Sequence, residues 1–322
     1  YGGNLPTTPY CQRADGRGPA WSNSLFEDNA QFGLGMRVSA DKLYGYAMEL
    51  VDKVLAKPEA PEAIKAVLTK IKSINQFDEK GQGVEAMRAA VAELKAALKN
   101  GCCSGKDCAC TCATGRQLLA VADNLVRKSV WILGGDGWAY DIGYGGLDHV
   151  LASGKNVKVL VMDTEVYSNT GGQSSKSSKT GSIAKFTASG KENAKKDLAK
   201  IALSYPHVYV ATISLGANMQ QAIKAFTEAK NYNGPSIIIA YAPCIAQGIL
   251  KGMSNTIEEE KLATKVGYFP IFRRNPETNE FKLDSDADFE GYMDFLMGET
   301  RYKALKKINP ERAEELYEQN KK

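Results

Sequence analysis

The sequence predicts an α/β protein with a mostly parallel sheet and helices on both of its faces. Uniformly apolar runs alternate along the chain with segments of helical spacing. Strands that are apolar on both sides are typical of parallel sheets covered by helices. Glycines and polar residues follow the apolar runs, at the edge where open parallel sheets bind ligands. With 322 residues, 43% of them apolar, the chain is long enough for one large domain or two ordinary ones.

The first elements are helical. Residues 1–38 show no sustained period, apart from a short helical turn expected at 25–31. Ser39 is then expected to cap a helix over 40–56. One side of this helix collects the apolar residues Leu43, Tyr46, Ala47, Leu50 and Leu55.

The next segments continue the helical spacing, over 63–74 and 83–98. A cysteine-rich loop follows at 101–113, and a further helix is expected over 116–128. We interpret about 57–114 as a helical and cysteine-rich insertion into the main domain.

Strands and helices then alternate. Four apolar runs predict strands at 129–135, 156–164, 207–214 and 235–243. Helical spacing between them predicts helices near 147–153, 192–204 and 218–230. The more polar segment 257–322, ending in a charged helix at 310–320, is expected to form a C-terminal arm on a domain of residues 1–256.

Composition excludes several classes of function. The 41 basic and 37 acidic residues leave a charge of +4, which gives no reason to expect nucleic acid as a partner. No apolar run is long enough for a membrane span, and residues 1–20 lack the apolar core of a secretory signal. Five of the seven cysteines lie within 102–112, which favours a reducing compartment over a secreted disulfide scaffold.

The segment after the first strand carries the first chemical signal. Gly135 and Gly137 flank Asp136 and precede Trp138. Glycines let a backbone approach a phosphate closely, but a carboxylate beside a phosphate needs a cation between them. Mg²⁺ is the simplest cation that would bridge Asp136 and a diphosphate.

The segment after the second strand offers matching ligands. The Thr164 hydroxyl, the Val166 carbonyl and the Asn169 amide are oxygen donors of the kind that Mg²⁺ prefers. An ordinary Gly-Asp-Gly turn remains the alternative. The chain contains no P-loop motif, and the glycines of 134–146 do not fit a dinucleotide fingerprint.

These motifs belong to a longer resemblance. Gly-Asp-Gly at a strand end, with Asn about thirty residues later, is the motif of thiamine diphosphate enzymes. The stretches 134–178, 16–36 (GRGPAWSNSLFEDNAQFGLGM) and 237–249 (IIIAYAPCIAQGI) resemble the thiamine-binding domain of the pyruvate:ferredoxin (flavodoxin) oxidoreductases. The resemblance implies a thiamine diphosphate-binding fold.

The resemblance assigns roles by position. Asp136, Thr164 and the Val166 carbonyl match the Mg²⁺ ligands of the family, and Asn169 matches an asparagine near the reacting carbon. Two segments match those that hold the cofactor, with the residues Gly135, Asp136, Gly137, Trp138, Thr164, Glu165, Val166, Tyr167, Ser168 and Asn169.

Cys244 matches the fourth thiolate of a [4Fe–4S] cluster. From the residues alone, it reads as a small core residue after a buried strand. The other three thiolates of the family lie upstream of the position that matches Tyr1, and Cys11 matches none of them. We therefore expect the sequence to be a C-terminal portion of a larger enzyme, and to be inactive alone.

The activity that the resemblance implies is oxidative decarboxylation of pyruvate with coenzyme A, giving acetyl-CoA and CO₂. Electrons would pass through [4Fe–4S] clusters to ferredoxin or flavodoxin, in a homodimer in the cytoplasm or in a reducing organelle such as a hydrogenosome. A non-redox thiamine diphosphate decarboxylase or carboligase, and a non-catalytic binding fragment, remain alternatives.

Four smaller signals stay open. The cysteine segment GCCSGKDCACTC reads as a mobile surface insertion, with an adventitious metal site or an oxidation-prone patch as alternatives. Residues 176–200 contain seven lysines, which form either a solvated surface or a docking surface for an acidic electron carrier. The Ser/Lys/Gly loop 174–182 is expected to be mobile, and His149 and His207 are expected to be structural.

Overall fold

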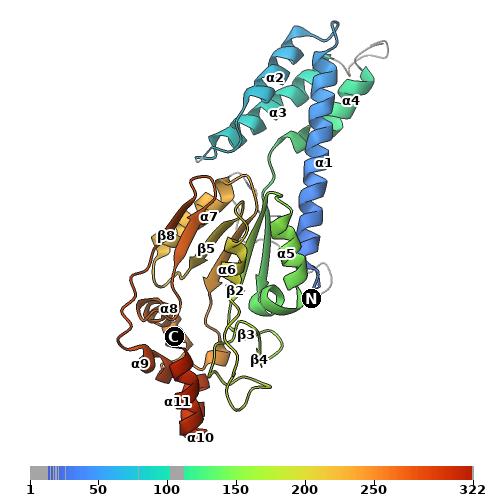
Figure 1. Cartoon of the computed structure of the whole chain (residues 1–322). Helices are drawn as coiled ribbons and strands as arrows, with labels where there is room; N and C mark the ends of the chain where they lie inside the picture. Colours follow the sequence, from blue (N-terminus) through green and yellow to red (C-terminus); the bar gives the residue numbers. More distant parts are fainter. Residues whose placement is uncertain are drawn as a thin grey trace. The chain divides into compact units, whose positions relative to one another are not determined.

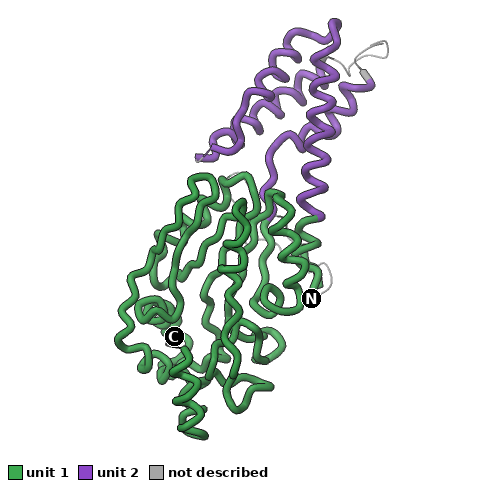
Figure 2. The backbone as a smooth tube through the Cα atoms, viewed as in Figure 1, with its two compact units in different colours: residues 1–34, 131–322 green, residues 35–130 purple. Residues whose placement is uncertain are grey.

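The computed structural model describes residues 14, 16, 18, 20, 22–25, 27–78, 80–101 and 112–320. It divides into two compact units, one of residues 1–34 and 131–322 and one of residues 35–130 (Figure 2). Cys11 and residues 102–111 of the cysteine-rich segment lie outside the described residues, so the expectations for them stay predictions. None of the described helices is both long enough and apolar enough to cross a bilayer.

The smaller unit is helical. It contains most of α1 (Asn29–Leu55), α2 (Glu62–Ser73), α3 (Gln82–Gly101), α4 (Cys112–Val121) and the 3-10 turn η1 (Ala122–Leu125). These elements share one apolar core, which includes Leu50, Val54, Ile64, Leu68, Ile71, Leu94 and Leu118. The helices predicted at 63–74 and 83–98 are confirmed.

Helix α1 begins earlier than predicted. It starts at Asn29, so Ser39 lies inside the helix and does not cap it. Glycines at 33 and 35 weaken the helical pattern in the sequence. A Cβ on Gly33 would lie 2.3 Å from Ile132 Cγ1, so the glycine allows α1 to pack closely against that side chain.

The larger unit contains a sheet of six strands. Its order is β1 (Val130–Gly135), β2 (Val157–Asp163), β6 (Ser236–Tyr241), β5 (Tyr209–Ile213), β7 (Phe272–Asn275) and β8 (Glu280–Leu283). β6 is parallel to both β2 and β5, whereas β7 and β8 are antiparallel additions. The four predicted strands are confirmed, and so is the mostly parallel α/β fold.

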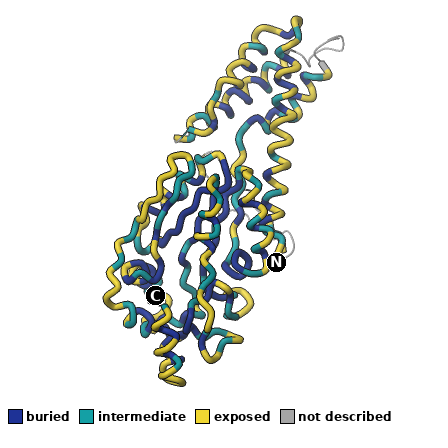
Figure 3. Tube along the Cα trace, in the orientation of Figure 1, coloured by how far each residue is buried: buried dark blue, intermediate teal, exposed yellow. Residues whose placement is uncertain are grey.

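Helices cover both faces of this sheet (Figure 1). Alternate strand residues pack with α5 (Tyr144–Ala152) and α6 (Leu198–Leu203) on one face, and with α7 (Met219–Asn231) on the other. β2, β5 and β6 are accordingly buried along most of their length (Figure 3). The helix predicted at 192–204 is shorter than expected, because it begins at Leu198 after the cap Asp197.

The C-terminal segment belongs to the same unit as the sheet. It supplies β7 and β8 and the helices α8 (Thr256–Lys265), α9 (Tyr292–Met297), α10 (Thr300–Ile308) and α11 (Pro310–Gln319). Side chains of α9, α10 and α11 lie in the main core, among them Phe295, Tyr302 and Leu316. The structure therefore divides the chain elsewhere than at the expected boundary between 256 and 257, because this segment completes the sheet and its core.

Candidate functional site

Three strand ends supply the residues of the candidate site. Asp136 follows β1 and directly precedes the π-helix η2 (Gly137–Ile142), Thr164 follows β2, and Cys244 follows β6. In the register of β2 and β6, Asp163 pairs with Tyr241, and Ala242 N donates to the Asp163 carbonyl at 3.0 Å. The parallel pairing therefore brings the segments after β2 and β6 side by side.

The three predicted metal ligands meet in the structure. Asp136 is fully buried, and its Oδ1 accepts from Thr164 Oγ1 at 2.8 Å and from Thr164 N at 3.2 Å. Thr164 Oγ1 also lies 3.0 Å from the carbonyl oxygen of Val166. The Thr164 hydroxyl thus lies next to both a carboxylate oxygen and a carbonyl oxygen, so the three predicted ligands are neighbours.

This donor set fits Mg²⁺. All three donors are hard oxygens, and Mg²⁺ in nucleotide and diphosphate sites is held by few protein ligands. Burial, together with the negative charge of Asp163, raises the pKa of Asp136 to about 7, although Ser175 and Thr164 donate hydrogen bonds to it. A cation would offset this penalty on the charged carboxylate. In the described residues no group of three His, Cys, Asp or Glu side chains could hold a metal ion, but this site needs only one carboxylate.

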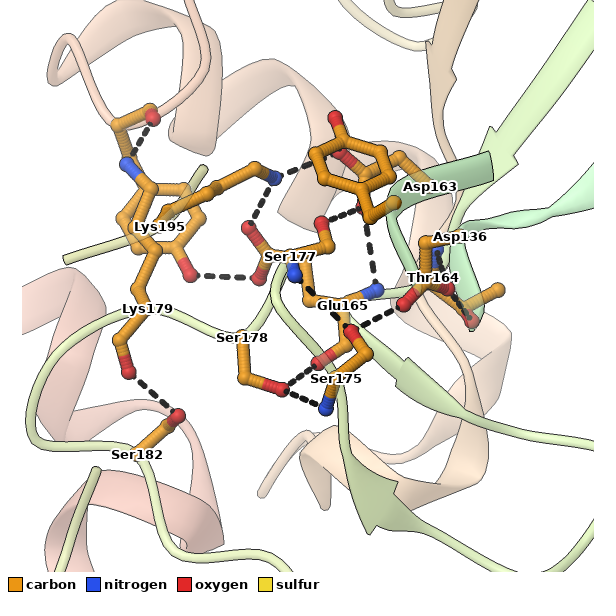
Figure 4. A network of polar contacts seen from close by, with 12 residues as sticks. Asp136, Asp163, Thr164, Glu165, Ser175, Ser177, Ser178, Lys179, Ser182 and Lys195 are labelled. Carbon is orange, nitrogen blue, oxygen red and sulfur yellow. Dashed lines mark hydrogen bonds and ion pairs between the residues drawn. The ribbon is translucent and has the colours of Figure 1, made fainter. Parts of the chain in front are cut away.

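Ser175 is a site residue that the sequence did not reveal. Its buried Oγ donates to Asp136 Oδ2 at 2.5 Å, so both oxygens of the carboxylate are fixed. Ser177 Oγ donates to Asp163 Oδ1, and Ser178 Oγ donates to the Glu165 carbonyl at 2.5 Å (Figure 4). The prediction of a mobile loop at 174–182 does not hold for these serines, because they are buried and bonded to the strand ends.

Glu165, predicted to contact the cofactor, is occupied by other partners. Its buried carboxylate accepts from Lys195 at 3.1 Å, from the Tyr268 hydroxyl at 2.6 Å and from Arg301 Nη2 at 2.7 Å. Burial alone would raise the pKa of Glu165, but Lys195, Arg301 and Lys179 outweigh it and lower the pKa to about 2. The side chain is thus an internal anchor, and the predicted contact of Glu165 with the cofactor stays a proposal for its backbone.

Lys195 holds both neighbours of Thr164. Its Nζ lies 2.6 Å from Asp163 Oδ2 and 3.1 Å from Glu165 Oε1 (Figure 4). Burial would lower the pKa of Lys195, but the two carboxylates raise it above its ordinary value. The ammonium therefore fixes the backbone on either side of a predicted metal ligand.

Other lysines of 176–200 also make internal contacts. Lys179 donates to the Tyr268 carbonyl, Lys191 to the carbonyls of Ser175 and Ser178, and Lys196 to the Tyr140 carbonyl. Burial lowers the pKa of each of these three lysines to about 8. The ammonium groups of these three lysines and of Lys195 are therefore bound within the chain, and the docking surface for an electron carrier stays a prediction.

Close packing within the chain accounts for several of the residues that were predicted to bind the cofactor. Trp138 is buried between Gly134 and Gly143, where a Cβ would lie 2.4 Å and 2.0 Å from the indole ring. A Cβ on Gly137 would lie 2.5 Å from the Tyr167 ring. Gly135 differs, because a Cβ there would meet nothing closer than the Met162 carbonyl at 4.0 Å. The chain itself thus gives no steric reason for glycine at 135, whereas an approaching diphosphate would.

Ser168 and Asn169 lie on an exposed turn. The turn joins β3 (Val166–Tyr167) to β4 (Gln173–Ser174), with Gly171 and Gly172 at φ values of 106° and 90°. The side chains of Ser168 and Asn169 are both exposed. The structure therefore leaves their predicted roles as proposals that depend on a bound ligand.

Cys244 caps the short helix η3 (Ile245–Gln247). Its Sγ accepts from Ala246 N at 3.3 Å, and its own N donates to Gln247 Oε1 at 2.6 Å. The thiol is partly exposed and free. The side chains of the other six cysteines lie outside the described residues, so no cluster can be assembled from the described part of the chain.

One family model overlaps the part of the chain that carries this site. A family model described as "Thiamine pyrophosphate enzyme, C-terminal TPP binding domain" matches residues 82–240. The match includes Asp136 and the segment 164–169, whereas Cys244 lies just beyond it.

Relatives match nearly the whole chain. It is 49% identical over 98% of its length to the pyruvate-flavodoxin oxidoreductase of Trichormus variabilis, and 47% identical over 98% to the pyruvate:ferredoxin oxidoreductase of Moorella thermoacetica. A mitochondrial pyruvate dehydrogenase [NADP(+)] of Euglena gracilis is 42% identical over 99%. The chain spans 26%, 27% and 17% of these proteins, respectively.

A solved 2-oxoglutarate:ferredoxin oxidoreductase from Magnetococcus marinus overlaps more weakly. The matched region covers 36% of this chain and 40% of the solved chain, with 24% identity. The TM-score of 0.34 is too low to support an argument about the site. The relatives and the family model confirm the resemblance to the oxidoreductases, and they confirm that the resemblance includes a thiamine pyrophosphate-binding domain.

Proposed function

We propose that this chain binds thiamine diphosphate together with Mg²⁺, as the cofactor-binding part of an enzyme that oxidises pyruvate. The observation that carries the proposal is the convergence of Asp136, Thr164 and the Val166 carbonyl at the ends of β1 and β2. The relatives are named as oxidoreductases of pyruvate that use flavodoxin or ferredoxin, so we extend that activity to the longer protein of which this chain would be a part.

The chain's own residues would hold the metal and the diphosphate. Asp136 Oδ1, Thr164 Oγ1 and the Val166 carbonyl would bind Mg²⁺, because Thr164 Oγ1 already lies 2.8 Å from the first and 3.0 Å from the last of these oxygens. Gly135 would let the backbone approach the diphosphate, and the segments 135–138 and 166–169 would flank it. Glu165 would act only through the backbone that it anchors.

When bound, thiamine diphosphate supplies the carbanion chemistry that permits loss of CO₂ from a 2-oxo acid. The protein would position and orient the cofactor and its metal ion. Ser175 and Thr164 fix the carboxylate of Asp136, while Lys195 fixes the two residues beside Thr164. Asn169, exposed at the turn, would face the substrate.

The proposal extends to an iron–sulfur cluster, to coenzyme A and to an electron carrier. Cys244 would supply one thiolate to a [4Fe–4S] cluster whose other ligands lie outside the described residues. Coenzyme A, ferredoxin or flavodoxin, a homodimer, and a cytoplasmic or reducing organellar location are proposed on the strength of the relatives alone. We expect the 322-residue chain alone not to reduce ferredoxin with pyruvate.

Calorimetry tests the proposal. Thiamine diphosphate with Mg²⁺ is titrated into the wild-type chain, into Asp136→Ala and into the control Asp286→Ala, which removes an exposed carboxylate of the same unit. We expect heat for wild type and for the control, and none for Asp136→Ala. Equal heat for Asp136→Ala would contradict the metal assignment. Cofactor binding by a full-length protein that contains no iron would favour the non-redox decarboxylase or carboligase.

A further inference from the structure

We propose that Gln247 is a positioning residue that couples Cys244 to the cofactor-binding segment at Thr164. The inference rests on the proposed function, because it assumes that thiamine diphosphate and Mg²⁺ bind at Thr164. It goes beyond that function by predicting that cofactor binding changes the reactivity of a thiol that the cofactor need not touch.

Both ends of one buried amide make the connection. Gln247 Oε1 accepts from Cys244 N at 2.6 Å, and Gln247 Nε2 donates to the Thr164 carbonyl at 3.1 Å. The side chain is 1% exposed, so water cannot replace either partner. An unpaired buried amide group costs free energy, so both bonds are expected to persist together.

The sheet explains why a single side chain can reach both segments. Thr164 and Cys244 follow β2 and β6, which pair in parallel up to Asp163 and Tyr241. Gly172 also lies near the same junction, since a Cβ built on it would come within 3.5 Å of the Ala246 Cβ. The turn that carries Asn169 and the short helix after Cys244 therefore pack together.

A coupling of this kind acts in both directions. If Mg²⁺ and diphosphate order the Thr164 carbonyl, they also order Gln247 and hence the backbone of Cys244. An ordered thiol that accepts a hydrogen bond from Ala246 N is expected to react more slowly with an alkylating reagent than one on a looser loop.

Alkylation of Cys244 measures the coupling directly. The full chain reacts with iodoacetamide, with and without saturating thiamine diphosphate and Mg²⁺, and mass spectrometry follows the Cys244 peptide separately from the other cysteines. In the wild type we expect the cofactor to slow the reaction by about fivefold or more, the lower end of ordinary coupling between sites.

Three variants separate coupling from simple shielding. Gln247→Leu removes both hydrogen bonds, and Gln247→Asn keeps the amide but is too short to bridge both partners. In both we expect the effect of the cofactor on Cys244 to fall below about twofold, well under ordinary coupling. The control Gln220→Leu replaces an exposed glutamine of α7 and should behave as wild type. Thermal unfolding confirms that each variant is folded.

The outcomes distinguish the two proposals. If wild type binds the cofactor but Cys244 reacts at an unchanged rate, the coupling is wrong and the proposed function stands. If Gln247→Leu and Gln247→Asn keep the full protection, bound cofactor shields Cys244 directly and the role of Gln247 is wrong. If wild type gives no heat with cofactor, the proposed function and the coupling fail together.

Discussion

Arg301 Nη2 donates a hydrogen bond to Glu165 Oε2 at 2.7 Å, although 136 positions of sequence separate the two residues. Both side chains are buried, and Glu165 lies between the proposed metal ligands Thr164 and Val166. Helix α10 therefore holds the backbone of the candidate site in place. The C-terminal segment is part of the structure that positions this site.

Replacing Arg301 with Met should destabilise the larger unit strongly. Removing one partner of a buried ion pair typically costs about 3–5 kcal/mol, because the other charge is left without compensation. Arg312→Met is the matched control, since Arg312 pairs with the more exposed Glu192 and Glu315 and its loss should change stability far less. Urea unfolding measures both variants. Equal stability of the two would contradict the importance of the buried pair.

The low pKa of Glu165 should make stability depend on pH. A carboxyl whose pKa falls from 4.5 to about 2 on folding contributes stability above pH 4.5, and loses it as the pH falls toward 2. At neutral pH this contribution is roughly 3 kcal/mol. Wild type should therefore be more stable than Glu165→Gln at pH 7, and the difference should shrink between pH 4.5 and pH 2. Urea titrations across this pH range measure the free energy of unfolding of both proteins. A difference between them that did not change with pH would contradict the prediction.

Ser175→Ala should weaken metal-dependent cofactor binding without preventing folding. The hydroxyl fixes Asp136 Oδ2, and removal of a group that orients a metal ligand typically lowers affinity by about 10–100-fold. Ser204→Ala is the control, because the exposed Ser204 hydroxyl donates to the Ile201 carbonyl at the end of its own helix. Calorimetry with thiamine diphosphate and Mg²⁺ gives both affinities. Unchanged affinity in Ser175→Ala would remove this residue from the site.

Gly135→Ala should separate binding from stability. The chain has room for a Cβ at 135, so stability should change by less than about 1 kcal/mol. Cofactor affinity should nevertheless fall, because the methyl group would lie where the diphosphate approaches the backbone. Gly145→Ala, at an open position of α5, is the control for both measurements. Unimpaired binding by Gly135→Ala would contradict the proposed path of the diphosphate.

The sequence predicted what depends on local pattern. The four predicted strands are largely apolar, and Asp136, Thr164 and Val166 follow strand ends, so their proximity at the carboxyl ends of the strands could be expected. The side chains that hold them could not be predicted, because Arg301 and Tyr268 carry no local signal of their contact with Glu165. Lys195 lies in a segment whose composition is typical of solvent-exposed loops. Only the folded chain shows that its ammonium is turned inward.

The most direct test of the central claim is electron paramagnetic resonance with Mn²⁺ in place of Mg²⁺. Mn²⁺ accepts the same oxygen ligands and reports its own binding. We predict that wild-type chain binds Mn²⁺ tightly only when thiamine diphosphate is present, and that Asp136→Ala does not bind it under the same conditions. The account would be contradicted if Asp136→Ala bound Mn²⁺ as tightly as wild type, or if wild type bound Mn²⁺ equally well without thiamine diphosphate.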